Sequence, residues 1–221
     1  MKLESIIAVI FCFLELSSAR SVERKRSANG AKSSRKQSCL LLELPLQENL
    51  NLKRFEGKWY GTLKTGIGDS LLSYFTEIYD ARIRFKINTE GGFDLNAVGS
   101  KFYGGWCPKG RGKAVIPDKD YPARMTMFFD TTIGRKIGMK PGWILRTDYD
   151  NYAILYSCWK EQTDGHCDPA STYAAVIQRS PKPLTPSKQA EIEKALKSAC
   201  VDSRKLSPVN HYGYCTGHDG L

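Results

Sequence analysis

The segment Phe55-Glu56-Gly57-Lys58-Trp59-Tyr60 decides the fold, because it opens the first of a regular series of β-strand patterns. Arg179 follows the last pattern of that series, directly after Tyr173-Ala174-Ala175-Val176-Ile177-Gln178. The Arg179 guanidinium can stack on the Trp59 indole only if the first and last strands are neighbours, and such stacking contributes about 0.5–2 kcal/mol. The pair therefore predicts a sheet that closes on itself, with this contact at its bottom.

Runs of β-branched and aromatic residues, separated by Gly, Asp and Pro, recur along the chain at the spacing of an antiparallel barrel or sandwich. In Arg82–Ile87 apolar residues alternate with basic ones, so one face of that strand meets a core and the other meets water. A similar alternation in Ala123–Phe129 directs Met125, Met127 and Phe129 inward. We expect an all-β fold, an eight-stranded antiparallel up-and-down barrel, with strands at Gly57–Lys64, Ile78–Ile87, Phe93–Gly99, Arg111–Ile116, Ala123–Asp130, Gly142–Thr147, Tyr152–Lys160 and Ser171–Arg179.

One α-helix is expected after the last strand. Thr185 is a candidate N-cap, and Pro186 suits the first helical position, where no backbone N–H is needed. An apolar stripe at helical spacing follows, and we expect the helix to pack against the outside of the barrel. The stripe consists of Ala190, Ile192, Ala195, Leu196 and Ala199.

The composition, with 41% hydrophobic and 25% charged residues in 221, is that of a soluble protein with one sizeable domain. The N-terminus carries an apolar run, Ile6–Leu14, followed by Ser17-Ser18-Ala19 with the small residues of a cleavage site. This pattern predicts a secretory signal over residues 1–19, and hence an extracellular protein. A membrane anchor is disfavoured because Glu4 and Glu15 bracket a run too short to span about 30 Å of hydrocarbon.

Residues 20–38 are strongly basic, with seven Lys or Arg residues against one Glu. We expect a disordered arm, because nothing in the segment can offset the entropy lost on ordering it. Arg24-Lys25-Arg26 is open to three interpretations: a processing site, a contact with an anionic surface, or a solvated arm. Since this arm carries +6 of the formal net charge of +10, nucleic acid is not expected as a partner of the folded domain, residues 39–221.

Cysteines provide a second framework. Removal of the signal leaves six, and an even number in a secreted chain predicts disulfides, with fifteen conceivable pairings. Cys158 and Cys167 flank a polar turn, so a local bridge between them is the safest expectation. The other four can join the ends of the domain, as Cys39 with Cys200 and Cys107 with Cys215.

A metal site, a cofactor or a catalytic role is not expected for these residues. Zinc sites offer two close pairs of ligands, and Cys158, His166 and Cys167 have no second pair nearby. If all six thiols are bridged, no thiolate remains as a nucleophile. His166, His211 and His218 lie in predicted turns or in the tail, which leaves no readable Ser/His/Asp arrangement and no axial ligand for haem. We therefore expect a binding protein rather than an enzyme.

The chain resembles the lipocalin family. The resemblance rests on Gly57-Lys58-Trp59, Thr147-Asp148-Tyr149 and Arg179, which occur in the order of the family's three motifs. Asp164-Gly165-His166-Cys167 and the ending His211-Tyr212-Gly213-Tyr214-Cys215 bring it closest to the retinol-carrying branch. It covers about residues 39–217, and it implies the bridges Cys39–Cys200, Cys107–Cys215 and Cys158–Cys167, with Gly57, Trp59 and Arg179 closing the barrel.

The resemblance also implies that a ligand enters at the open end, past an apolar loop that contains Leu71, Leu72, Tyr74 and Phe75. Two positions depart from the retinol carrier: Leu155 stands where it has a glutamine, and Ala175 where it has a phenylalanine. The interior should therefore be more apolar near Leu155 and roomier near Ala175. The expected ligand-binding residues are Leu72, Phe75, Leu95, Ala97, Met125, Met127, Phe129, Leu155, Tyr173 and Ala175.

These expectations together predict a secreted carrier of a small hydrophobic molecule, retinol or a related retinoid or isoprenoid. The alternatives are another lipophile, such as a fatty acid, carotenoid or bilin, and an isomerase of the kind found in one lipocalin branch. The family also implies a plasma or cell-surface protein as a partner, and no span of a membrane is expected.

Overall fold

The computed structural model describes residues 39–65, 78–100, 106–131, 135–136 and 138–217. The chain divides into two compact units, residues 1–36 and 37–221, and all described residues belong to the second. The predicted signal and basic arm lie outside the described residues. So does the predicted entrance loop, with Leu72 and Phe75.

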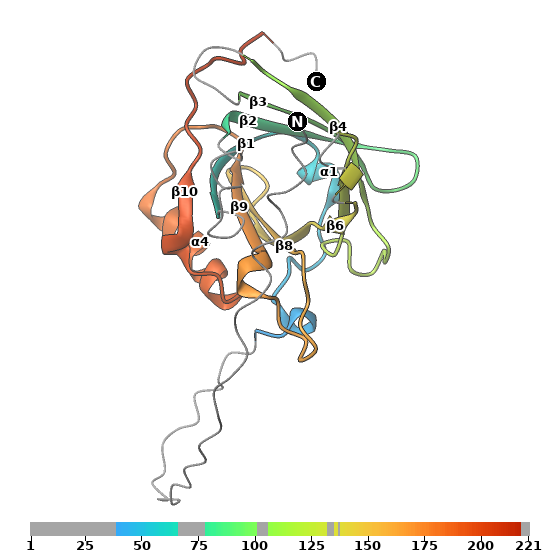
Figure 1. Ribbon diagram of the computed structural model, residues 1–221. Coiled ribbons are helices and arrows are strands. Elements are labelled where there is room, and N and C mark those ends of the chain that lie inside the picture. Colours follow the sequence, from blue (N-terminus) through green and yellow to red (C-terminus); the bar gives the residue numbers. More distant parts are fainter. Residues whose placement is uncertain (1–38, 66–77, 101–105, 132–134, 137, 218–221) are drawn as a thin grey trace, which may run out of the picture. The chain divides into compact units, whose positions relative to one another are not determined.

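The domain is built on one antiparallel sheet (Figure 1) in which neighbouring strands follow the order β6-β5-β4-β3-β2-β1-β9-β8-β7, with β10 paired to β1 beyond the end of β2. All eight expected strands are present. The strands are β1 (Gly57–Thr65), β2 (Tyr79–Ile87), β3 (Phe93–Ser100), β4 (Lys109–Val115), β5 (Thr126–Phe129), β6 (Lys140–Pro141), β7 (Trp143–Thr147), β8 (Tyr152–Cys158), β9 (Thr172–Gln178) and β10 (Leu206–Pro208).

The two ends of this strand order meet, which makes the sheet a nearly closed barrel. The Gly142 N–H donates to the Met125 carbonyl at 2.9 Å, and the Ile144 N–H donates to the Ala123 carbonyl at 3.0 Å. The path has nine strands rather than the expected eight because the expected sixth strand is divided into β6, which pairs with β5, and β7, which pairs with β8. The break falls next to Pro141, which has no N–H to donate to a ladder.

Short helices accompany the barrel. The described residues include the helices α1 (Leu52–Phe55) and α4 (Pro186–Ser198) and the 3-10 turns Leu41–Glu43, Pro169–Ser171 and Ser203–Lys205. The Thr185 hydroxyl accepts a hydrogen bond from the Lys188 N–H at 3.4 Å, as expected of an N-cap.

Two apolar clusters lie on opposite faces of the sheet. The inner cluster fills one end of the barrel and includes Phe55, Trp59, Phe85, Phe93, Leu95, Met125, Ile144, Ala153 and Ile177. The outer cluster packs α4 against β7, β8 and β9 and includes Leu145, Tyr152, Ile154, Tyr156, Val176, Ile192, Leu196 and Ala199. The prediction that Ala190 belongs to the apolar stripe of this helix is wrong. Ala190 is exposed, because it lies on the side of α4 that faces away from the barrel.

Three disulfides link the domain, in the pairing that the lipocalin resemblance implies. They are Cys39–Cys200, Cys107–Cys215 and Cys158–Cys167, with Cα–Cα distances of 5.8, 5.7 and 5.7 Å. No helix in the described part of the chain is long and apolar enough to cross a membrane.

Candidate functional site

The closed end of the barrel is held by Arg179. Its guanidinium lies 3.7 Å from the centre of the Trp59 ring. The same group donates hydrogen bonds to the carbonyls of Tyr149 at 2.8 Å, Lys58 at 3.1 Å and Arg54 at 2.7 Å. Burial lowers the pKa of Arg179, and the Asp150 carboxylate opposes that shift. One planar cation therefore ties the first strand, α1 and the β7–β8 turn together.

Below this cation the barrel is filled by an aromatic cluster. Trp59 is fully buried, and its Nε1–H donates to the Phe55 carbonyl at 2.9 Å. The Phe55 ring lies 5.1 Å from Trp59 and meets Phe85 edge-on at 5.0 Å. Rings packed in this way leave no room for a ligand, so the closed end is a structural region.

Gly57 completes the closed end, because two constraints require a glycine. Its φ is +110°, a backbone conformation that side chains disfavour, and a Cβ there would lie 3.1 Å from Nη1 of Arg179. The glycine of the first motif thus allows the arginine of the third to reach across it.

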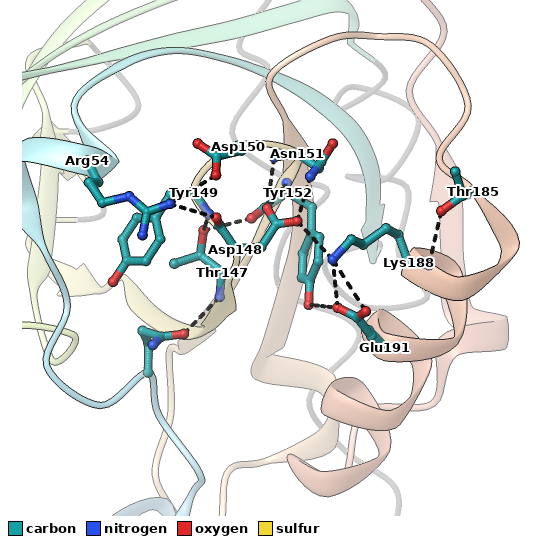
Figure 2. Close-up of polar contacts among 11 residues, drawn as sticks. Arg54, Thr147, Asp148, Tyr149, Asp150, Asn151, Tyr152, Thr185, Lys188 and Glu191 are labelled. Carbon is teal, nitrogen blue, oxygen red and sulfur yellow. Dashed lines mark hydrogen bonds and ion pairs between the residues drawn. The ribbon is translucent and has the colours of Figure 1, made fainter.

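The second motif forms the turn between β7 and β8 (Figure 2). The Thr147 hydroxyl donates to the Tyr152 carbonyl at 2.7 Å and accepts from the Tyr149 N–H at 2.9 Å. Tyr149 has φ +69°, which these bonds hold in place, and its carbonyl is thereby turned toward Arg179. The Arg54 guanidinium stacks 4.3 Å from the Tyr149 ring and pairs with Asp150 at 2.9 Å.

Asp148 connects this turn to α4. Burial acts to raise its pKa, but hydrogen bonds from Tyr152, Asn151 and Lys188 outweigh burial and hold the pKa of Asp148 below its usual value. Lys188 lies 3.3 Å from both Asp148 and Glu191, and the Tyr152 hydroxyl donates to Glu191 at 3.2 Å (Figure 2). The network thus fixes the helix to the closed end, away from the opposite end of the barrel.

The eight described residues predicted to bind ligand share the inner face of the barrel. Register pairs Leu95 with Phe85 and Gly112, and Gly112 with Phe129. By the same pairing, inward side chains face one another across every pair of neighbouring strands. The pairs are Ile83 with Ala97, Ala114 with Met127, Leu155 with Ala175, and Ser157 with Tyr173, and Met125 belongs to the inner cluster.

Exposure along this inner face changes from one end of the barrel to the other. Met125 and Leu95, next to the aromatic cluster, are 0% and 1% exposed. Ala97, Met127, Phe129, Leu155 and Tyr173 are only half-buried, although they also face inward. Their accessible surface therefore faces the barrel interior, toward the end opposite Arg179.

Strand β4 contributes almost no side chain to this part of the wall. Its inward positions are Gly110 and Gly112, paired with Ala97 and Leu95. A Cβ at Gly112 would lie 2.1 Å from the Phe128 carbonyl and 3.0 Å from the Phe129 ring. The Phe129 ring therefore lies against bare backbone, which only glycine permits.

Lys64 is an inward position that simple alternation from Trp59 misses. Between Gly61 and Leu63 the register with β9 shifts by one residue, so that Leu63 pairs with Val176 and packs against the outer cluster. Lys64 then pairs with Ala175 and belongs to the inner face. A β-bulge of this kind reverses alternation and leaves no clear signal in the sequence.

The Tyr173 hydroxyl on the inner face has a shifted pKa. Burial raises the pKa of its hydroxyl to about 12, although the residue retains some accessible surface. The tyrosine is therefore neutral at physiological pH and can donate a hydrogen bond to a polar group inside the barrel.

Known proteins that resemble this chain were found by sequence and by structure, whereas no family model matches it. Chicken (Gallus gallus) purpurin is 28% identical over 188 residues, which cover 81% of this chain and 89% of purpurin. Chicken retinol-binding protein 4 is 26% identical over 185 residues, covering 80% and 88% of the two chains.

Solved structures agree on the fold. Lobster apocrustacyanin A1 matches with a TM-score of 0.60 at 23% identity, covering 78% of this chain and 88% of that one. H1 crustacyanin from the lobster Homarus americanus matches with a TM-score of 0.56 at 24% identity, covering 75% and 80%. With its three motifs assembled at the closed end of the barrel, the chain is similar to lipocalins in sequence and in fold.

Proposed function

We propose that this protein carries a small hydrophobic molecule inside the barrel, and that the cargo is a retinoid or a related isoprenoid. The observation that supports the proposal is the change of exposure along the inner face. Trp59 and Phe85 are fully buried at one end, whereas Met127, Phe129 and Leu155 keep accessible apolar surface toward the other. Apolar surface that faces inward and stays accessible is what a hydrophobic ligand needs.

Burial of the ligand's apolar surface can supply much of the free energy of binding. Burial of about 300 Å² of ligand surface at about 25 cal/mol/Å² is worth several kcal/mol, from which the costs of association are subtracted. The apolar term is about 7.5 kcal/mol, against the roughly 8 kcal/mol that corresponds to a micromolar Kd, so apolar burial can supply most of the free energy of micromolar binding without a charged contact.

The names of similar proteins and the residues on the inner face support a retinoid as the ligand. Relatives named retinol-binding protein 4 support a retinoid. Leu155 and Ala175 place apolar side chains, one of them small, next to each other on the inner face, while Lys64 and Tyr173 supply hydrogen-bond donors on the same face. A retinoid with a hydroxyl or carboxyl group at one end suits both features.

Fluorescence titration with all-trans-retinol tests the proposal. Ala97→Phe places a ring on a half-buried inward position and is expected to weaken binding at least about 10-fold, a loss of roughly 1.4 kcal/mol. The matched control is Ala190→Phe, which adds the same ring to the exposed side of α4 and should bind as the parent does. Circular dichroism checks that both variants fold. No saturable signal below ~10 μM retinol in the parent would remove the retinoid version.

We also propose that the protein is secreted after removal of residues 1–19. Three disulfides support this location, since such bridges persist in oxidising compartments. N-terminal sequencing of protein from the culture medium tests it, and a chain that stays inside the cell with its first 19 residues attached would contradict it.

A further inference from the structure

The outer face of β1–β4 carries a basic surface that the carrier proposal does not use. Register brings cations on neighbouring strands side by side: Lys58 pairs with Arg84, and Asp94 pairs with both Lys86 and Lys113. In the next rows Arg111 pairs with Asn96, and Lys109 with Val98. We call this surface the basic wall. It consists of Lys58, Arg84, Lys86, Lys109, Arg111 and Lys113.

Most of these charges have no acidic partner among the residues that the structure describes. In the described part of the chain, the one ion pair on the wall joins Lys113 to Glu90 at 2.7 Å. Lys58 and Arg84 lie directly opposite each other, and like charges in that arrangement destabilise a sheet. Nε of Arg84 is buried and has no hydrogen-bond partner within the described residues. The wall therefore resembles half of an interface whose other half is anionic.

The wall also accounts for most of the net charge of the domain. Residues 39–221 contain 25 Lys and Arg against 20 Asp and Glu, a net of +5. The six wall cations and the two carboxylates among them, Glu90 and Asp94, contribute +4 of that excess. Elsewhere on the domain, positive and negative charges are almost balanced.

We propose that the basic wall binds a sulfated polysaccharide of the heparin class. From β1 to β4 the wall crosses three strand spacings, about 14 Å, and Lys109 to Lys113 covers roughly another 13 Å along β4. A linear polymer with regularly spaced sulfates can contact several cations over such an area. Arg84 and Arg111 can hold sulfate oxygens with two donors each.

Other polyanions fit the surface less well. Between the cations the wall presents Asn96 and Asp94 rather than large apolar side chains, whereas stable attachment to a bilayer uses buried apolar area. The three disulfides favour an oxidising compartment, where sulfated polysaccharides occur and nucleic acids are scarce. Binding at the basic wall is separate from binding of cargo, because the wall side chains point away from the barrel interior.

Affinity for heparin, measured on the full secreted protein at several salt concentrations, tests the proposal. The wall variant is Arg84→Gln/Lys86→Gln/Arg111→Gln. The control is Lys160→Gln/Lys194→Gln/Lys205→Gln, which removes the same charge from exposed positions on other elements. By analogy with other polyanions, loss of three contacts should reduce the slope of log K against log salt by about 2. We expect heparin binding to weaken about 10–100-fold at physiological salt in the wall variant, and less than about 3-fold in the control.

Several outcomes would overturn the assignment. Equal weakening in the two triple variants would mean that net charge or the basic arm is responsible. Equal affinity for heparin and for its desulfated form would remove the sulfate contacts, and tighter binding to phosphatidylserine vesicles than to heparin would favour a membrane surface. Arg111→Gln alone, at an exposed position, tests the wall if the triple variant fails to fold, and should weaken binding several-fold. Retinol titration of the same variants separates this result from the carrier function.

Discussion

Replacement of Arg179 by methionine should loosen the closed end of the barrel. The substitution keeps most of the aliphatic stem but removes three hydrogen bonds of 2.7–3.1 Å and the cation over Trp59. At about 1 kcal/mol for each hydrogen bond and about 1 kcal/mol for the stacking, the loss is about 4 kcal/mol. Water can reach part of this half-buried site, so we expect about 3–4 kcal/mol, or roughly 10 °C in Tm.

Arg179→Lys separates charge from shape. A lysine keeps the positive charge and a hydrogen bond, but it cannot reach three carbonyls from one plane, so we expect a loss of about 2 kcal/mol. Urea unfolding with the disulfides intact measures both variants. The control is Arg204→Met, whose guanidinium is exposed and pairs with the nearby Asp202, and which should change stability by less than about 0.5 kcal/mol.

Loss of the Arg179 contacts should lower stability without weakening ligand binding. Because Arg179 lies at the end opposite the half-buried inner residues, folded Arg179→Met protein should bind retinol with an affinity within about 3-fold of the parent. Lost binding with an unchanged unfolding midpoint would refute the assignment of this end as structural.

Three further predictions concern other parts of the domain. Cys107→Ser/Cys215→Ser opens a loop of 108 residues and should lower the free energy of unfolding by about 4–5 kcal/mol in the chain-entropy model, measured by urea unfolding. The matched control is Cys158→Ser/Cys167→Ser, which opens a loop of 9 residues and should cost less, about 2–3 kcal/mol; equal losses in the two variants would contradict the loop-entropy account. A folded pKa of about 12 for Tyr173, above the usual value near 10, means that the folded state holds its proton longer, so stability contributed by this group is complete below pH ~10 and is lost between pH ~10 and ~12. Tyr173→Phe should flatten that decline in alkaline unfolding curves, and an unchanged slope would contradict the buried hydroxyl. Lys64→Met should weaken all-trans-retinoic acid at least about 5-fold more than retinol, since only the acid offers a carboxylate; equal effects on the two ligands would place the ammonium away from the cargo.

The sequence predicted those parts of the fold that depend on local pattern. Alternation in Arg82–Ile87 gave the correct inward face, with Phe85 buried and Ile83 and Ile87 packed against the inner cluster. Thr185 and Pro186 gave the correct start of α4. Arg179 and Trp59 meet as expected, because a residue pair that needs two distant strands to be neighbours reports on closure directly.

What the sequence could not give depends on register between strands. The basic wall needs Lys58 opposite Arg84, and Arg111 one strand beyond Asn96, and neither pairing is visible in a single strand. Ala190 fits the helical period of α4 yet is exposed, because the period does not say how wide the buried stripe is. Most of the predicted ligand contacts share an inner face, but occupancy by a ligand stays a prediction.

The register shift at Thr62 divides β1 into two segments that can vary in length independently. Below it, Trp59 belongs to the closed end; above it, Lys64 faces Ala175. Because the bulge absorbs one residue, deletion of Thr62 would give a regular strand in which both side chains still face inward. Loss of this one residue therefore leaves the same side chains lining the interior. Relatives are best aligned to this strand in two parts, one outward from Trp59 and one outward from Lys64. For a relative without the bulge, an alignment with no gap at Thr62 would match interior residues of one chain with surface residues of the other.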